Sequence, residues 1–311
     1  MTDALRFADV SKRFGVRGKR ALDGMTFTVP LGSITGFVGP NGAGKTTTFG
    51  VVSGFLQPDQ GEVDILGEGA FDPVRLKGRL GVLPQDAELP DRHTPLELLT
   101  HLARLQGLSR AKARDEAHRL VTLVRLADRQ DHRITTLSHG IRRRVAVASA
   151  LCGAPELVLL DEPLAGLDPS QAHSLRDRLA ELRGRQTLVI SSHNLAEIER
   201  LCDHVIMVQD GRCLRQGAMR SLTGADEVSR WQLARGLTKD ELTDLRAALP
   251  EGARVVAQGE WLELHAPHAL TEAVSVAMMG ALHRHAIPLR GLTRGRGLER
   301  TFLDDQARDP A

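Results

Sequence analysis

Hydrophobic and polar positions follow two patterns in the first two thirds of the chain. They alternate over residues 5–10 and 21–30, which predicts two strands separated by a turn at residues 15–20. Short, mostly apolar runs follow, and they lie at residues 34–38, 80–83, 157–160 and 187–192. Such runs are typical of strands covered on both faces, as in a parallel sheet. The pattern predicts an α/β fold that begins with an antiparallel β subdomain.

Capping sequences mark where helices begin. Thr94-Pro95-Leu96-Glu97 has a threonine N-cap, a proline at the first helical position and a glutamate three residues after the cap, so a helix is expected there. Asp168-Pro169 and the stretch from Asn194 to Glu197 have related spacings. Apolar residues at helical spacing then predict a helical subdomain over about residues 90–150.

The last third of the chain predicts a second domain. It shows the order strand, helix, strand, strand, helix, strand at residues 228–233, 238–249, 254–257, 261–265, 270–285 and 287–292. This order is typical of a small α+β domain of the ferredoxin-like kind. A chain of 311 residues is long enough for two domains, which we place at 1–222 and 223–311. Trp231, Trp261 and the pair Met278-Met279 are expected in the core of the second domain.

Composition limits the classes of partner. The chain has 41 basic and 39 acidic residues, so its net charge of +2 gives no electrostatic reason to expect a nucleic-acid partner. Cys152, Cys202 and Cys213 have no metal-ligand spacing, and their odd, sparse number indicates a reducing compartment. No apolar run approaches the roughly 18 residues that span a bilayer, and no signal-peptide core follows Met1. A cytoplasmic location is therefore expected.

The first candidate site is a glycine-rich loop that follows the apolar run 34–38. It fits the phosphate-binding pattern G-x-x-x-x-G-K-[ST] and comprises Gly39, Pro40, Asn41, Gly42, Ala43, Gly44, Lys45, Thr46 and Thr47. Small residues let backbone N–H groups converge on phosphates, Lys45 can reach the outer phosphates, and Thr46 can offer a hydroxyl to Mg²⁺. A helix starting near Lys45 would add its positive dipole end. The alternative is a glycine-rich turn with a solvated lysine.

Polar residues also follow the other predicted buried strands. Asp161 and Glu162 come directly after residues 157–160, where open α/β sheets bind ligands. Asp161 is placed to hold Mg²⁺ and Glu162 to take a proton from water, or one of them only caps the next segment. Gln85 can orient water or touch Mg²⁺, or only cap a loop. His193 can donate to a terminal phosphate, or be an ordinary hydrogen-bonded loop residue.

Two further segments admit two interpretations each. The stretch Leu137-Ser138-His139-Gly140-Ile141 precedes an amphipathic helix and can form an anion site at its N-terminus. Taken alone, it is described more simply as a helix cap followed by a solvated basic face at Arg142-Arg143-Arg144. Phe14 is either a surface on which a purine ring stacks or an ordinary residue packed at a sheet edge.

Together and in this order, these motifs resemble the ATP-binding cassette (ABC) ATPases over about residues 4–222. The resemblance implies a P-loop NTPase core with a helical insertion, and a head-to-tail homodimer that sandwiches two molecules of ATP. It also implies that residues 39–47 hold the phosphates, that Mg²⁺ lies at Thr46, Asp161 and Gln85, and that Glu162 is the general base.

The resemblance assigns further roles at the dimer interface. Ser138 and Gly140 match the signature motif, which contacts the ATP held by the other subunit. Asp168 matches the loop that communicates between the two sites, and His193 matches the switch residue at the γ-phosphate. Phe14 takes the place of the aromatic residue, commonly tyrosine, on which adenine stacks, and stacking needs no hydroxyl.

This signature departs from the usual Leu-Ser-Gly-Gly-Gln, because it has His139 and Ile141 in place of the first glycine and the glutamine. The serine and the second glycine, which the phosphate contact needs, are both present. Residues 297–303 are similar to the short helical ending of ATP-binding subunits from exporters of drugs, lipids or polysaccharides.

The leading hypothesis is an ATPase that powers transport, with export preferred, as a homodimer beneath separate transmembrane permease subunits. Such a protein would be peripheral on the inner face of the cell membrane, and its second domain would be regulatory or dimer-stabilising. The alternative is a soluble ABC ATPase acting on ribosomes or DNA. A single P-loop, the absence of a heptad insertion and the balanced charge oppose it. A catalytically inactive subunit is disfavoured because Lys45, Asp161, Glu162 and His193 are all present.

Overall fold

The chain forms two compact units, Met1–Gln216 and Gly217–Ala311. The computed structural model describes residues 3–15, 18–224, 227–295, 297–299 and 301–302. Within these residues, no helix combines the length and the hydrophobicity that crossing a bilayer requires.

A six-stranded sheet forms the centre of the first unit, with the strand order β5-β6-β7-β3-β8-β9. Its strands are β3 (Ile34–Val38), β5 (Leu80–Leu83), β6 (Leu157–Asp161), β7 (Thr187–Ser192), β8 (His204–Gln209) and β9 (Arg212–Ala218). The pairs β5–β6, β6–β7, β7–β3 and β3–β8 are parallel. Every residue of β3, β6 and β7 is buried, which confirms the expectation drawn from their apolar runs. Because these strands are parallel, their carboxyl ends meet at one edge of the sheet.

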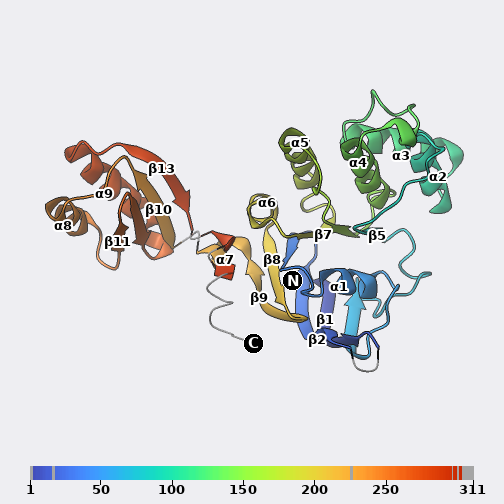
Figure 1. The fold of residues 1–311 in the computed structure, drawn as a ribbon, viewed down its shortest axis with the longest axis horizontal. Coiled ribbons are helices and arrows are strands. Elements are labelled where there is room, and N and C mark those ends of the chain that lie inside the picture. Colours follow the sequence, from blue (N-terminus) through green and yellow to red (C-terminus); the bar gives the residue numbers. More distant parts are fainter. Residues whose placement is uncertain (1–2, 16–17, 225–226, 296, 300, 303–311) are drawn as a thin grey trace. The chain divides into compact units, whose positions relative to one another are not determined.

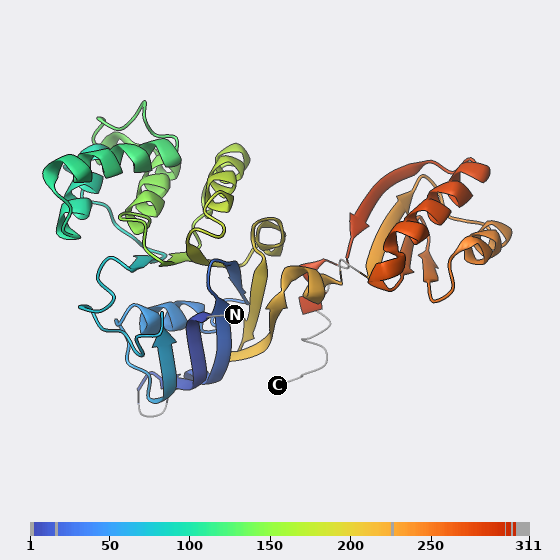
Figure 2. The ribbon, with the colours of Figure 1, turned by 180° about the vertical axis from the view of Figure 1, so that it is seen from behind.

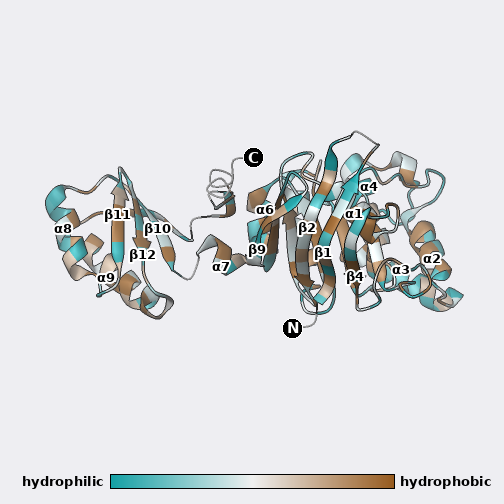
Figure 3. Cartoon of the chain, turned by 90° about the horizontal axis from the view of Figure 1, so that it is seen from below, coloured by the Kyte–Doolittle hydropathy of each residue, from teal (hydrophilic) through white to brown (hydrophobic). Residues whose placement is uncertain are grey.

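A three-stranded antiparallel sheet of order β2-β1-β4 packs onto this centre. It consists of β1 (Asp3–Arg13), β2 (Arg20–Pro30) and β4 (Gln60–Ile65), and hydrophobic and hydrophilic residues alternate along β1 and β2 (Figure 3). A row of aromatic rings joins the two sheets: Phe7 stacks on Phe27 at 4.6 Å, Phe27 meets Phe37 of β3 at 5.4 Å, and Phe37 meets Phe49 at 6.0 Å between centroids. This packed row fixes the helix after the glycine-rich loop against both sheets.

Three helices of the first unit, at residues 95, 169 and 195, begin where the capping sequences predicted. The helices of this unit are α1 (Lys45–Val52), α2 (Pro95–Leu105), α3 (Arg110–Leu123), η1 (Ile134–Thr136), α4 (His139–Ala150), α5 (Pro169–Ala180) and α6 (Leu195–Leu201). Thr94 and Glu97 form a complete capping box, Asp168 accepts from the N–H of Gln171, and Asn194 accepts from that of Glu197. The helices α2, α3 and α4, drawn in green, gather into one group in both Figure 1 and Figure 2.

The second unit contains the predicted order of strands and helices. It comprises α7 (Met219–Thr223), β10 (Val228–Leu233), α8 (Lys239–Ala248), β11 (Arg254–Gln258), β12 (Trp261–His265), η2 (His268–Leu270), α9 (Thr271–Arg284) and β13 (Leu289–Arg294). The sheet order β11-β12-β10-β13, with antiparallel neighbours, confirms the ferredoxin-like fold.

Each of two expectations about the core of this unit is correct for one residue of a pair and wrong for the other. Trp231 is fully buried, whereas Trp261 is 38% exposed. Because side chains alternate along β12, Leu262 and Leu264 occupy the core face and Trp261 lies on the other face, beneath the guanidinium of Arg230 at 5.1 Å.

The methionine pair divides in the same way, because adjacent helical residues point in different directions. Met278 is buried and Met279 is 49% exposed.

In the tail, Leu298 and Phe302 are buried, while residues 300 and 303 of the expected helical ending lie outside the described residues. The cysteines are reduced, with Cys152 and Cys202 buried and Cys213 half-buried.

The two tryptophans provide a matched test of this packing. We expect Trp231→Ala to lower the free energy of unfolding of the second unit by about 3–5 kcal/mol, because it leaves a large cavity in the core. Trp261→Ala should cost under about 1 kcal/mol. Denaturant titrations followed by the fluorescence of the remaining tryptophan measure both values. Equal losses in the two variants would contradict the assignment of faces.

Candidate functional site

The predicted polar residues converge at the carboxyl edge of four neighbouring parallel strands. Gln85 follows β5, Asp161 and Glu162 end β6, His193 follows β7, and the glycine-rich loop follows β3. These strands are consecutive in the sheet, so segments distant in sequence become neighbours. Together they line a cavity of about 730 Å³. The lining residues are Ala21, Asn41, Gly42, Gly44, Lys45, Thr46, Thr47, Gln85, Asp86, His139, Arg143, Asp161, Glu162, Ala165, Gly166 and His193.

The glycine-rich loop wraps the N-terminus of α1. Gly44, the N-cap residue, has a φ of 103°, and a Cβ at this position would lie 2.7 Å from the carbonyl oxygen of Ala21, so only glycine fits. The loop closes through a hydrogen bond from the N–H of Ala43 to the carbonyl of Pro40 at 3.1 Å. Backbone N–H groups at this helix end are suited to bind phosphate.

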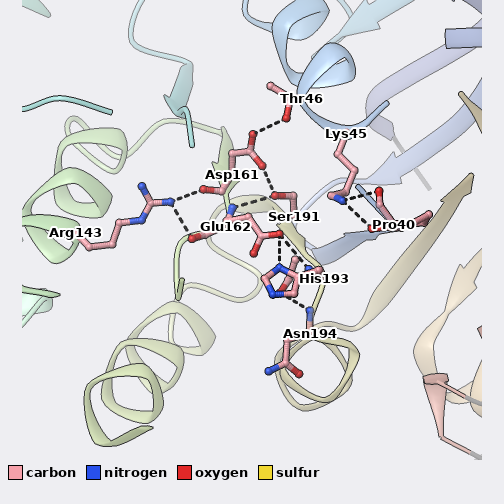
Figure 4. A network of polar contacts seen from close by, with 11 residues as sticks. Pro40, Lys45, Thr46, Arg143, Asp161, Glu162, Ser191, His193 and Asn194 are labelled. Carbon is pink, nitrogen blue, oxygen red and sulfur yellow. Dashed lines mark hydrogen bonds and ion pairs between the residues drawn. The ribbon is translucent and has the colours of Figure 1, made fainter. Parts of the chain in front are cut away.

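Lys45 is a positively charged residue that lines the cavity. Its side chain is buried, and its Nζ donates to the carbonyl oxygens of Gly39 at 2.7 Å and Pro40 at 3.2 Å (Figure 4). Burial lowers the pKa of Lys45, and the nearby carboxylates of Glu162 and Asp161 oppose this effect. Because its partners are neutral carbonyls, an anion in the cavity can compete for this ammonium group.

Asp161 is a buried carboxylate held by two hydroxyls. Ser191 donates to its Oδ1, and Thr46 donates to its Oδ2 at 3.3 Å. Burial raises the pKa of Asp161, and the hydrogen bonds from Ser191 and Thr46 partly offset the rise. Among the described residues, no cluster of three or more His, Cys, Asp or Glu side chains could hold a metal ion. A hydroxyl beside one carboxylate is a donor set that could hold Mg²⁺, which prefers few protein oxygens and completes its shell with phosphates and water.

Glu162 is held from both its side chain and its backbone. Its Oε1 accepts from the backbone N–H of His193 at 3.1 Å and lies 2.9 Å from the Nδ1 of the same residue. Its own N–H donates to the hydroxyl of Ser191 at 2.9 Å. The backbone of Glu162 is left-handed, with a φ of 49°. A non-glycine residue in this region costs about 1–3 kcal/mol, so the surrounding contacts must hold it there.

Arg143 was missed by the sequence reasoning, which placed it in a solvated basic face. Its side chain is only 9% exposed, and its guanidinium reaches from α4 to the ends of β5 and β6. No sequence signal separates it from its neighbours Arg142 and Arg144, because only the packing of α4 buries Arg143. Ser191 was likewise missed, because its role depends on the pairing of β6 with β7.

Seven predicted residues are not among those that line this cavity: Gly39, Pro40 and Ala43 of the glycine-rich loop, and Phe14, Ser138, Gly140 and Asp168. Ser138 is the exposed N-cap residue of α4 and its hydroxyl makes no capping hydrogen bond. Gly140 packs against the side chain of Gln171 on α5, where a Cβ would lie 2.3 Å from Oε1 of that residue. Phe14 is half exposed just after β1.

His139, the unusual residue of the signature, does line the cavity. Its ring packs against Gly166, where a Cβ would lie 2.8 Å from Cε1 of His139. Gly166 has a φ of 73°, so both its conformation and its space require glycine. The first turn of α4 is therefore packed against the loop that leads to Asp168.

The fold and this site together define a P-loop nucleoside triphosphatase. Residues 22–165 match the family described as "ABC transporter". The Nod factor export ATP-binding protein I of Ralstonia nicotianae is 35% identical over 312 residues, covering 97% of this chain and 93% of that protein. The protein of the same name from Burkholderia orbicola is 35% identical over 243 residues, covering 76% and 79%. The chain belongs to the ABC transporter ATP-binding family, and it is an ATPase.

Solved structures give the same result for the fold. CbiO1 of Clostridium perfringens, part of an ABC transporter complex, is 25% identical with a TM-score of 0.65, covering 72% of this chain and 92% of that chain. A dimeric ATP-binding cassette in a post-hydrolysis state with ADP and Pi is 24% identical with a TM-score of 0.64, covering 70% and 99%.

The buried carboxylate of Asp161 leads to a prediction about stability. We expect Asp161→Asn to raise the melting temperature of the nucleotide-free protein at neutral pH, because burial penalises the ionised form. Below the ordinary pKa of 3.8 the carboxyl is protonated in both the folded and unfolded states, so the two proteins should be equally stable. The gap should open as the pH rises through the raised folded pKa.

Thermal unfolding followed by circular dichroism from about pH 4 to 8 tests this. Asp131→Asn, at an exposed position, is the control and should show no such gap. A lower melting temperature for Asp161→Asn at neutral pH would show that the hydrogen bonds from Ser191 and Thr46 outweigh the cost of burial.

Proposed function

We propose that this chain is the ATP-hydrolysing subunit of an exporter, working as a homodimer beneath separate membrane subunits. The observation that carries the proposal is the convergence of Lys45, Asp161, Glu162 and His193 in one cavity at the sheet edge. The direction of transport rests on the relatives, whose names describe export ATP-binding proteins. The ribosome or DNA alternative gains no support from these relatives or from the balanced charge.

The residues of the site have separate roles in phosphoryl transfer. Lys45 and the backbone N–H groups of residues 39–47 bind and orient the phosphates. Thr46 and Asp161, with Gln85 at the cavity wall, would hold Mg²⁺, which neutralises developing charge when bound. Glu162 accepts the proton of the attacking water. His193 fixes the carboxylate of Glu162 and would contact the terminal phosphate as the switch residue.

The homodimer is supported by residues that do not line their own cavity. Ser138 and Gly140 form a helix N-terminus, which favours an anion. Asp168 caps the neighbouring helix α5. In a head-to-tail dimer these groups would meet the ATP bound by the other subunit, and Phe14 would stack on the adenine of its own subunit. Two solved cassettes of the same fold are described as dimeric, which supports a dimer.

Substitution of the proposed general base, Glu162, tests ATP hydrolysis separately from ATP binding. We expect Glu162→Gln to lower kcat at least about 100-fold, because the amide cannot accept the proton, and to preserve ATP binding. With ATP it should elute as a dimer in size-exclusion chromatography with light scattering. His173→Gln, an exposed position on α5, serves as the control and should keep the wild-type rate. Hydrolysis near the wild-type rate would remove Glu162 from this role, and a monomer without bound ATP would overturn the homodimer.

A groove of about 410 Å³ beside the site is suited to a helix from the permease. It is lined by Phe55, Phe71, Leu80, Val82 and Pro84, among others, and Phe55 is 82% exposed. Such an apolar groove favours an amphipathic helix. Because Pro84 precedes Gln85, a helix bound here would touch the segment that enters the catalytic cavity. This would place the chain on the inner face of the membrane.

Phe55→Asp tests the groove. We expect it to abolish co-purification of a polytopic membrane protein from detergent extracts, because a buried charge without a partner opposes docking. Leu31→Asp is the control, since Leu31 is also exposed but does not line the groove, and it should leave co-purification intact. Retained nucleotide binding shows that each variant is folded. Equal co-purification with both variants would exclude this groove.

The second unit is proposed to be regulatory or dimer-stabilising. Its helix α9 presents the exposed side chains of Val276 and Met279, and Leu292 of the edge strand β13 is also exposed. Exposed apolar residues of this kind are typical of an interaction surface.

A further inference from the structure

One guanidinium, that of Arg143, contacts two segments of the catalytic cavity through three backbone carbonyls. Its Nη1 donates to the carbonyl of Gln85 at 3.0 Å. Its Nη2 donates to the carbonyls of Asp161 at 2.5 Å and Glu162 at 2.8 Å (Figure 4). We propose that Arg143 is a positioning residue that holds the peptide of Glu162 in its left-handed conformation and links it to helix α4.

The peptide groups on both sides of Glu162 are held. Its N–H donates to Ser191 of β7, and its carbonyl accepts from Arg143 of α4. The conformation with a φ of 49° turns the chain sharply where β6 ends, which aims the side chain at His193. If one of these hydrogen bonds is lost, the backbone of Glu162 can relax to an ordinary conformation, and its carboxylate then moves away from His193.

The arginine is suited to this task by its shape. A planar guanidinium presents several donors in a fixed fork, whereas the ammonium of lysine is a single point with a flexible stem. The side chain is buried, and burial lowers the pKa of Arg143, while Asp161, Glu162 and Asp86 oppose this effect. Its carbonyl partners are neutral, so the fork positions the backbone and leaves both carboxylates free for the reaction.

The neighbouring arginines have other contacts. Arg142 is exposed and its Nε donates to the carbonyl of Leu137, and Arg144 donates to the carbonyls of Val124 and Arg125 at the end of α3. Neither has a hydrogen bond to Gln85, Asp161 or Glu162. Arg142 therefore offers a matched control on the same helix.

The connection to α4 gives Arg143 a further consequence, which rests on the proposed homodimer. Helix α4 begins at the turn of Ser138 and Gly140 that would meet the ATP of the other subunit. A shift of α4 moves Arg143, and with it the peptide of Glu162. Binding of ATP at one site would in this way order the general base at the other.

Kinetics of Arg143→Met, Arg143→Lys and Arg142→Met test the proposal. We expect Arg143→Met to lower kcat about 100-fold, or about 2.7 kcal/mol, with KM for ATP within about threefold of wild type. Arg143→Lys keeps the buried charge but loses the fork and should lower kcat about tenfold. Arg142→Met should keep the wild-type kcat. A role in stability alone would lower the melting temperature without this split between kcat and KM.

A double mutant locates the effect at the peptide of Glu162. Arg143→Met and Ser191→Ala together should reduce kcat by less than the product of the two single effects, because both release the same peptide. A kcat within about threefold of wild type in Arg143→Met would overturn the proposal. If Arg143→Met does not fold, Arg143→Lys provides the test. The proposal predicts that this variant loses about tenfold in kcat, so a kcat within twofold of wild type would overturn it.

The same variants separate this inference from the proposed homodimer. Arg143→Met combined with Glu162→Gln should still form the ATP-bound dimer, because both Nη atoms of the arginine are engaged by backbone carbonyls and not assigned to the phosphates. If Glu162→Gln alone stays monomeric with ATP, the homodimer fails while the kcat of Arg143→Met still decides the role of Arg143. If only the combined variant stays monomeric, Arg143 acts on ATP-driven assembly and the positioning role is overturned.

Discussion

Parallel pairing of β5, β6, β7 and β3 is the constraint on which the site depends. Each strand delivers its polar residues at its carboxyl end, and the pairing brings four such ends to one edge of the sheet. Burial of β3, β6 and β7 on both faces holds the register. A slip of one residue would turn Asp161 away from Thr46 and into the packed layer. Hydrophobic packing therefore sets the geometry of the polar site.

The cavity balances buried charges of opposite sign. Lys45 and Arg143 lie close to Asp161 and Glu162, and burial disfavours the ionised form of Lys45, Arg143 and Asp161. Each charge reduces the cost of the others, and neutral carbonyls accept from the Nζ of Lys45 and from both Nη atoms of Arg143. A site arranged in this way is ready for an anion with several negative charges, because Lys45 is held by weakly competing carbonyl groups rather than by a salt bridge.

Sequence patterns were most informative for features that depend on residues close together in the sequence. The glycine-rich loop is continuous, its conformations require glycine, and its helix follows directly, so nine consecutive residues could be named before any fold was known. Capping residues such as Thr94 and Asp168 are local for the same reason. Arg143 was not predicted, because Arg142, Arg143 and Arg144 are identical in kind and only the packing of α4 buries one of them. Trp261 was misplaced because the order of residues does not say which face of β12 is covered.

The amino-acid sequence by itself determined the class of fold, the motif that binds phosphate, and the types of residue available for catalysis. These follow from hydrophobic periodicity and from backbone requirements that act over a few residues. Only the tertiary structure decided which of these residues meet. The contacts of Arg143 and Ser191 with Glu162 join segments 19 and 29 residues apart. Such contacts depend on strand order and helix packing, which arise from the burial of the whole core and not from any single stretch of the chain.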